Sequence, residues 1–223
     1  MTKPKPELWV CLYDIHYPQY DRKTFRSILT FIRKNEVHGL LLGGDALDLS
    51  CVSHWNKDLP GNKRKGELKS DLDGFEREIL RPLEALLPRD CEKVFLVGNH
   101  ERTLEQDLSE TMPELDGMID FKQYLRLAER GFKVIPLGGD YEIGELLCIH
   151  FALGVPQVYV TGSGPRRHFS SRARRDLTDP AVSSNGAKGY IRKQNANTDL
   201  LPAIEAALRG DRFVSSGFGL SVL

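Results

Sequence analysis

The chain has 223 residues, a hydrophobic fraction of 40%, and 31 basic against 31 acidic residues. This composition can build a hydrophobic core, suits one domain or one domain with a fragment, and excludes a globally disordered protein. The net charge of zero argues against a protein that holds nucleic acid by bulk electrostatics. No apolar run is long enough to cross a bilayer and no signal-peptide pattern follows Met1, so we expect a cytoplasmic protein without a membrane partner.

Hydrophobic periodicity predicts strands and helices that alternate along the first two-thirds of the chain. Short apolar runs predict strands at residues 8–13, 37–42, 94–97, 132–135, 140–143 and 146–149. Apolar residues at three- and four-residue steps predict helices at residues 21–35, 71–87 and 121–130. The charged segment from Lys57 to Lys69 is predicted to be a solvated loop. The alternation indicates an α/β fold whose sheet is at first largely parallel.

The C-terminal third has a weaker pattern. Residues 151–180 show no clear period and are predicted to form a loop. Residues 189–191 are predicted to be a short strand, followed by a helix that Thr198 would cap and Gly210 would end. The apolar face of this helix would consist of Leu201, Ile204, Ala207 and Leu208.

Each of the first three predicted strands ends in a polar cluster. The clusters are Asp14 with His16, Asp45 with Asp48, and Asn99 with His100. In open α/β sheets, ligands bind outside the carboxyl ends of the strands, so these side chains should converge in space. Asp, Asn and Gly also favour turns, and strand-end turn chemistry is therefore the alternative interpretation of the set.

The residue types in these clusters suit a metal site. A mixture of carboxylate, imidazole and amide ligands is typical of Mn, Fe or Zn and differs from a structural thiolate zinc site. Gly44 would let the backbone bend toward a ligand. A carboxylate between two ligand sets could bridge two ions, which together can hold the attacking and leaving oxygens of a phosphoryl displacement.

Three segments resemble the first three motifs of the calcineurin-like metallophosphoesterases: Asp14-Ile15-His16, Gly44-Asp45-Ala46-Leu47-Asp48 and Gly98-Asn99-His100-Glu101. The resemblance extends over a domain at residues 1–153. This domain is similar to the phage and bacterial branch of the family, which resembles DNA-repair exonucleases. The resemblance implies a four-layer sandwich of two mixed sheets flanked by helices. It also implies hydrolysis of phosphate esters, phosphodiesters in particular, by a metal-bound hydroxide at a site with two divalent ions. Manganese is the expected metal, with iron, zinc and magnesium as alternatives, and nucleic acid is among the candidate substrates.

The resemblance also implies which residues bind the metals. Asp14 and His16 would bind the first ion, and Asp45 would bridge both ions. Asn99 and His150 would bind the second ion, with His150 at the end of its own predicted strand. A hydrogen-bonded core histidine is the alternative interpretation of His150.

Two further residues would act in the reaction. By resemblance, His100 would protonate the leaving oxygen or stabilise charge on the phosphate. Asp48 would orient the imidazole of His100, and its alternative role is that of a helix cap.

The chain lacks the Gly-His-x-His segment that closes the site in this family and supplies one ligand to each metal. The only histidine after His150 is His168, and one imidazole cannot replace two. The expected sandwich would therefore lack its final strands, and its site would be short of ligands. An inactive phosphoesterase-like remnant is accordingly the alternative function.

Residues 180–223 resemble the last strand and helix of a response-regulator receiver domain, with Lys193 in place of the lysine that contacts the phosphorylated aspartate. The earlier receiver strands have no counterpart, and a signalling protein with a receiver-like tail is a third hypothesis. Residues 154–179 would form the junction between the two parts. Its arginines could contact nucleic-acid phosphates or form a solvated link: Arg166, Arg167, Arg172, Arg174 and Arg175. The sequence predicts no oligomeric state.

Overall fold

The computed structural model describes much of the first 160 residues and shorter segments beyond them. The described residues are 7–51, 67–111, 120–144, 146–150, 156–160, 189–190, 195–209, 211 and 213–214. The chain divides into two compact units, one of Met1–Gly139 with His150–Pro156 and the other of Asp140–Ile149 with Gln157–Leu223. The domain boundaries predicted at residues 153 and 179 are based on resemblance to protein families. The two units are defined by contacts and do not test these boundaries, which stay predictions.

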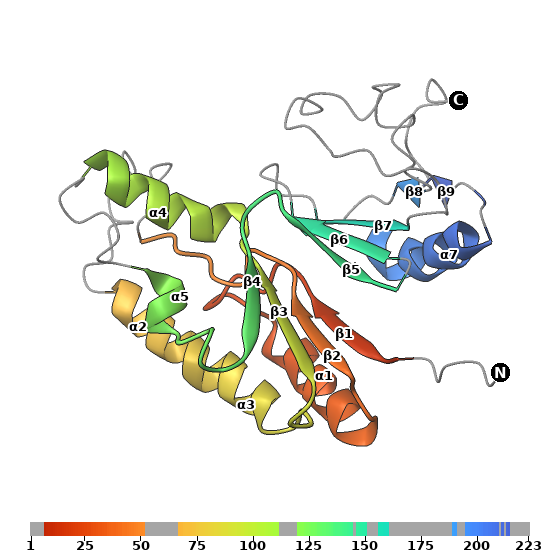
Figure 1. Ribbon diagram of the computed structural model, residues 1–223, viewed down its shortest axis with the longest axis horizontal. Helices are drawn as coiled ribbons and strands as arrows, with labels where there is room; N and C mark the ends of the chain where they lie inside the picture. Colours follow the sequence, from red (N-terminus) through yellow and green to blue (C-terminus); the bar gives the residue numbers. More distant parts are fainter. Residues whose placement is uncertain are drawn as a thin grey trace. The chain divides into compact units, whose positions relative to one another are not determined.

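The first unit is built on a parallel four-stranded sheet (Figure 1). Its strands are adjacent in chain order: β1 (Trp9–Leu12), β2 (Gly39–Leu42), β3 (Glu92–Leu96) and β4 (Phe132–Ile135). Leu12 pairs with Leu42, and Leu42 pairs with Phe95, so the carboxyl ends of the first three strands lie at one edge. The expected α/β class is confirmed. In the described part of this unit, however, the sheet is parallel rather than mixed, because helical crossovers connect its successive strands.

Helices connect the strands of this sheet. They are α1 (Arg22–Lys34), α2 (Glu67–Phe75), the π-helical segment η2 (Glu76–Leu80), α3 (Arg81–Glu84), α4 (Asn99–Thr111) and α5 (Phe121–Tyr124). The helix predicted at 71–87 is confirmed, although it begins earlier and contains a π-helical segment. Its start at Glu67 makes the end of the predicted charged loop helical. The helix predicted at 121–130 is wrong beyond Tyr124, where a left-handed residue, Arg126 (φ 53°), interrupts it and turns follow.

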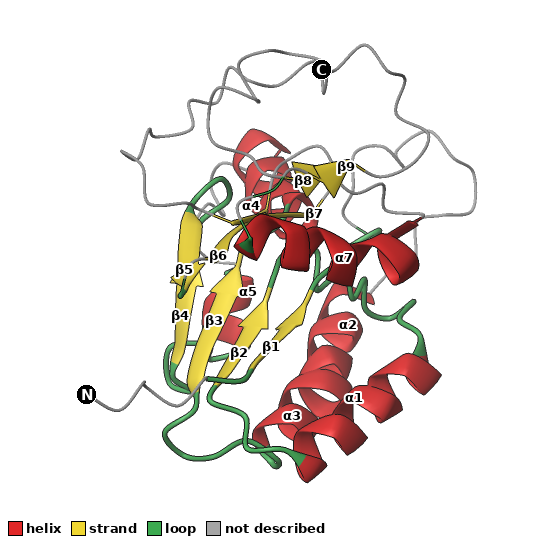
Figure 2. Ribbon diagram, turned by 90° about the vertical axis from the view of Figure 1, so that its right-hand side faces the viewer, coloured by secondary structure: helices red, strands yellow, loops and turns green. Residues whose placement is uncertain are grey.

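One hydrophobic core joins the helices to the sheet. Helices α1, α2 and α3 lie together on one side of the sheet (Figure 2). Asp21 caps α1 by accepting hydrogen bonds from the N–H groups of Lys23 and Thr24. Phe25 and Ile32 of the same helix are buried. They share the core with residues of the sheet and of α2 to α3, including Leu40, Leu42, Phe95, Phe75, Ile79 and Leu83. Each such side chain stabilises the fold by about 1.5–3 kcal/mol, which holds the strand ends in a fixed relation.

The second unit is mostly strands in its described part. Its elements, the first three of which form one sheet, are β5 (Asp140–Ile143), β6 (Leu146–His150), β7 (Pro156–Val160), β8 (Gly189–Tyr190), α7 (Ala196–Leu208) and β9 (Phe213–Val214). His150 at the end of β6 and Pro156 at the start of β7 belong to the first unit. β6 is antiparallel to β5, and β8 is parallel to β9. The strands predicted at 140–143, 146–149 and 189–191 are confirmed in their described residues. The loop predicted for 151–180 is wrong at β7, whose Gln-Val-Tyr-Val run pairs with β6 despite its short length.

The C-terminal helix differs from its prediction in two respects. α7 begins at Ala196, so Thr198 lies within its first turn, where its hydroxyl donates to the Asn195 carbonyl instead of capping the helix. Leu201 is 66% exposed, whereas Ala203 and Ala206 are buried. Several predictions lie outside the described residues, namely those for His168, the five junction arginines, Ile191, Lys193 and Gly210. Within the described segments, no helix combines the length and apolarity needed to span a membrane.

Candidate metal centre

Three of the predicted ligands have left-handed backbone conformations. Asp14, His16 and Asp45 have φ values of 52°, 51° and 49°. Such a conformation costs a non-glycine residue roughly 1–3 kcal/mol, which the surrounding structure must offset, and it is concentrated at functional sites. Here the N–H of Asp14 donates to the Gly44 carbonyl (3.1 Å), and that of His16 donates to the Asp45 carbonyl (2.9 Å). The loops after β1 and β2 are therefore held side by side by their own backbones.

Two glycines allow the closest approaches in this region. Gly44 has a φ of 92°, and a Cβ on it would lie 2.5 Å from the His150 ring. A Cβ on Gly98 would lie 2.2 Å from the backbone nitrogen of Asp45. Because neither glycine has a side chain, the loops after β2 and β3 and the end of β6 can meet.

His150, Asp45 and Asn99 meet in one group, in which His150 and Asp45 are buried. Nε2 of His150 lies 3.3 Å from Oδ2 of Asp45 and 3.1 Å from Oδ1 of Asn99. Nδ1 of His150 lies 2.9 Å from the Gly43 carbonyl, which can only accept, so the neutral imidazole carries its proton on Nδ1 and a lone pair on Nε2. Three electron-pair donors thus face one another. Ligands about 2.1 Å from an octahedral ion are about 3 Å apart, so this spacing fits a divalent cation.

The Asn99 amide can serve this group in two orientations. With its oxygen inward, it adds a third electron-pair donor for a cation. Rotated by half a turn, its NH₂ would donate to Nε2 of His150 (3.1 Å) and to Oδ2 of Asp45 (3.0 Å). The first orientation suits a bound cation and the second suits the metal-free group.

His16 lies between two aspartates. Its Nδ1 is 3.2 Å from Oδ1 of Asp48, and its Nε2 is 3.7 Å from Oδ1 of Asp14. The neighbouring carboxylates of Asp14 and then of Asp48 raise the pKa of His16 from 6.5 to about 9. In the metal-free protein this imidazole is therefore a cation at neutral pH, and a metal ion would have to displace its proton.

His100 is tied to the loop after β2. Its backbone N–H donates to Oδ1 of Asp45 (3.1 Å), and its Nδ1 donates to the backbone carbonyl of Asp48 (2.6 Å). The His100 ring stands edge-on to the ring of His16, with centroids 4.7 Å apart. The carboxylate of Asp48 lies 3.9 Å from Nδ1 of His100 and is therefore closer to His16, so the backbone of Asp48 does more to orient His100 than its side chain.

The structure brings all seven predicted site residues together through the contacts given above. They are Asp14, His16, Asp45, Asp48, Asn99, His100 and His150. Ligand atoms of His16, Asp45 and His100 all lie within 4.8 Å of one another. The convergence inferred from the strand ends is thus present, whereas the metal-binding roles stay predictions.

The charges of this cluster support one another. Burial acts to raise the pKa of Asp45, but the hydrogen bond and charge of His150 outweigh it and lower that pKa. Burial acts to lower the pKa of His150, but the hydrogen bond and charge of Asp45 outweigh it and raise that pKa. The hydrogen bond from His16 lowers the pKa of Asp48. Both aspartates are therefore carboxylates at neutral pH, as metal binding requires.

The raised pKa of His16 predicts a pH-dependent stability of the metal-free protein. Because the folded state holds this proton more tightly, the contribution is fully present below pH 6.5 and is lost as the pH rises to about 9. The loss should be at most about 3 kcal/mol. Urea unfolding in EDTA at pH 6 and pH 9.5 measures it, and His16→Asn should remove it. An equal pH dependence in this variant would contradict the assignment.

Glu101, for which the sequence pattern predicts no role, is 0% exposed. Its Oε2 accepts hydrogen bonds from the N–H groups of Gly98 (2.9 Å) and Asp45 (3.2 Å), and its Oε1 accepts one from Leu47 (2.9 Å). Burial raises the pKa of this carboxyl group. Its position directly after the predicted site residues Asn99 and His100 is the signal that the sequence offers.

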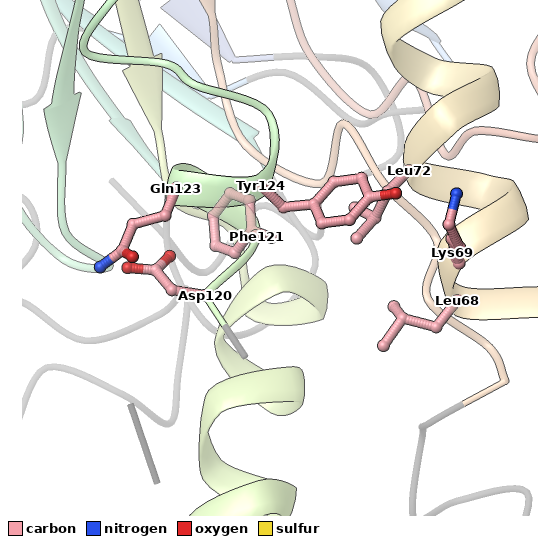
Figure 3. Close-up of a pocket in the computed structure, with 7 residues that line it drawn as sticks. All are labelled: Leu68, Lys69, Leu72, Asp120, Phe121, Gln123 and Tyr124. Carbon is pink, nitrogen blue, oxygen red and sulfur yellow. The ribbon is translucent and has the colours of Figure 1, made fainter. Parts of the chain in front are cut away.

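A separate pocket of about 420 Å³ opens between α2 and α5 (Figure 3). Its walls combine apolar and polar side chains: Leu68, Lys69, Leu72, Asp120, Phe121, Gln123 and Tyr124. At its rim Tyr124 donates to Asp73 (2.6 Å), which also pairs with Lys69 (2.6 Å). None of the seven site residues lines this pocket.

Comparison of the chain with models of protein families, with curated proteins and with solved structures finds no match. The geometry of this cluster is therefore the basis for a proposed function.

Proposed function

We propose that the chain is a metal-dependent hydrolase of phosphate esters, phosphodiesters in particular, of the calcineurin-like metallophosphoesterase type. One observation carries the proposal. Both histidines that would bind metal have Nδ1 against an oxygen acceptor, which leaves Nε2 as the ligand atom: His16 on the Asp48 carboxylate and His150 on the Gly43 carbonyl. Metal-ligating histidines almost always have their second nitrogen held in this way, whereas strand-end turns do not require it.

The donors fit two cation positions that share one carboxylate. Asp14 and His16 with Asp45 would hold the first ion, and Asn99 and His150 with Asp45 would hold the second. This set of oxygen and nitrogen donors favours manganese, with iron, zinc and magnesium as alternatives. When bound, two such ions would activate a water nucleophile and neutralise charge on the phosphate.

The residues of the chain would orient the substrate and move its proton. His100 has Nδ1 fixed by the backbone of Asp48, so a proton on its Nε2 could pass to the leaving oxygen or stabilise charge on the phosphate. Asp48 holds His16 with its carboxylate and His100 with its carbonyl, and it would thus position both.

The proposal also includes the finer fold and the substrate class. The parallel sheet of the first unit would be part of a four-layer sandwich of two sheets flanked by helices, without the final strands of the family. Nucleic acid is the candidate phosphodiester, as in the branch that the motifs resemble.

Hydrolysis of bis-(p-nitrophenyl) phosphate with added Mn²⁺ tests this function. His100→Ala should lower kcat by roughly 10²–10⁴-fold, because it removes the proton donor. His38→Ala removes a histidine outside the cluster and should leave kcat within about twofold of the parent. Circular dichroism would verify that each protein is folded. Absence of metal-dependent turnover by the folded parent chain would refute the enzyme proposal.

An inactive remnant is the second candidate, and the missing Gly-His-x-His segment favours it. Calorimetric titration with Mn²⁺ separates the two. Two bound ions per chain with turnover support the enzyme, whereas binding of two ions without turnover or no binding supports the remnant.

A further inference from the structure

Glu101 joins the two strand-end loops that carry the proposed bridging and proton-donating residues. Its two oxygens accept hydrogen bonds from backbone N–H groups on both sides: Gly98 in the loop after β3, and Asp45 with Leu47 in the loop after β2. A carboxylate is the one side chain whose two ends both accept, so it matches three converging N–H groups. Glu101 is also fully buried, and burying a carboxyl group is costly unless its hydrogen bonds are complete.

The link between the loops is reciprocal. Glu101 accepts from the N–H of Asp45, while Asp45 accepts from the N–H of His100. The two carboxylates therefore brace the loops in opposite directions. These hydrogen bonds enclose Asp45, whose φ is 49°, and Gly98, which lies against the Asp45 backbone.

We infer that Glu101 is a positioning residue that holds Asp45 in its left-handed conformation, so that the Asp45 carboxylate can bridge two metal ions. Glu101 acts through Asp45 and His100 and does not itself contact metal or substrate. The inference rests on the proposed metal-dependent function, because it concerns the geometry of the same site.

Glu101→Gln tests it with almost no change in shape. Glutamine has one accepting and one donating end, so its NH₂ must face an N–H group of Leu47 or those of Gly98 and Asp45. We expect Mn²⁺ affinity in calorimetry to fall about 10–100-fold, the range seen when groups that orient metal ligands are removed. With Mn²⁺ added to saturation, kcat should fall by a similar factor while KM changes less than about threefold, since Glu101 does not touch the substrate.

Electron paramagnetic resonance gives a readout that a merely structural role would not move. Two Mn²⁺ ions bridged by Asp45 should give an exchange-coupled signal in the parent protein. In Glu101→Gln the spectrum should change to that of isolated Mn²⁺ at equal metal loading. Glu105→Gln is the matched control, because Glu105 is one turn along the same helix and pairs with Lys122 (2.6 Å). This control should keep the parent affinity and spectrum.

The outcomes separate the inference from the proposed function. If Glu101→Gln keeps the parent affinity and coupled spectrum, the positioning role is overturned while the enzyme proposal stands. If the parent binds two coupled ions but shows no turnover, the enzyme proposal fails, and the affinity and spectrum of Glu101→Gln still decide the inference. A parent chain that binds no Mn²⁺ overturns both. Should Glu101→Gln not fold, Glu101→Asp retains the charge but is too short to reach both loops, and it should show the same loss of coupling.

Discussion

Asp45→Asn is expected to abolish metal-dependent hydrolysis, with a loss in kcat/KM on the order of 10³-fold or more. Asp45 contacts both donor groups: its backbone carbonyl accepts from the N–H of His16 (2.9 Å), and its Oδ2 lies 3.3 Å from Nε2 of His150. Asparagine has nearly the same shape, but it removes the negative charge and puts an NH₂ group in place of one ligand oxygen. The fold should persist, since the remaining amide oxygen can still accept from His100.

The measurement pairs kinetics with metal binding. Hydrolysis of bis-(p-nitrophenyl) phosphate gives kcat/KM, and calorimetry should show the loss of at least one Mn²⁺ per chain. Asp90→Asn, an exposed aspartate outside the cluster, is the matched control for loss of one carboxylate and should behave as the parent does. An Asp45→Asn protein with parent-like turnover would remove Asp45 from the mechanism.

The convergence of the site could be predicted from the sequence because it follows from topology. Apolar runs ending at Tyr13, Leu42 and Val97 give three strands, and helical segments between them make those strands parallel. Parallel strands place their carboxyl ends at one edge, so the polar residues after them had to meet. His150 belongs to a different strand, β6, and its place in the cluster was expected from family resemblance alone.

The brace by Glu101 could not be predicted, because it depends on three-dimensional contacts between loops more than fifty residues apart in sequence. Periodicity predicts which residues are buried against the core, but not which buried carboxyl group faces backbone N–H groups. The left-handed backbone conformations of Asp14, His16 and Asp45 could not be predicted from the sequence for a related reason. Such conformations are seldom adopted by non-glycine residues, and here tertiary hydrogen bonds impose them.

Errors in the predicted elements have similar physical causes. The run from Leu8 to Tyr13 predicts a buried strand, yet Cys11 is exposed, because in the described sheet β1 is an edge strand with a neighbour on one side only. The pattern predicts Leu201 on the apolar face of its helix, but Leu201 is exposed, whereas Ala203 and Ala206, which the pattern does not place on that face, are buried. In both cases the pattern identified the element correctly, whereas its neighbours determined which side chains are covered.

Among substitutions that add a single methyl group near the site, Gly98→Ala is expected to cause the largest loss in the free energy of unfolding. The added Cβ would lie 2.2 Å from both the backbone nitrogen and Oδ1 of Asp45, and 2.7 Å from Oε2 of Glu101. A contact with backbone cannot be relieved by a change of rotamer, so the loops after β2 and β3 must move apart. Overpacking of this kind costs typically 1–3 kcal/mol, and we expect a loss of about 3 kcal/mol in the free energy of unfolding.

Gly138→Ala provides the comparison, because a side chain at Gly98 would collide with neighbouring atoms, whereas one at Gly138 would meet only an unfavourable backbone conformation. Gly138 has a left-handed φ of 79° but nothing within 4 Å of its Cβ position, so alanine there should cost only about 1 kcal/mol of backbone strain. Urea unfolding in EDTA compares the two losses without any contribution from bound metal. Calorimetry should then show that Gly98→Ala loses Mn²⁺ binding and that Gly138→Ala retains it. Equal losses of stability would mean that the loops can separate at little cost, and parent-like Mn²⁺ binding by Gly98→Ala would mean that their close approach is not what holds Asp45 in place.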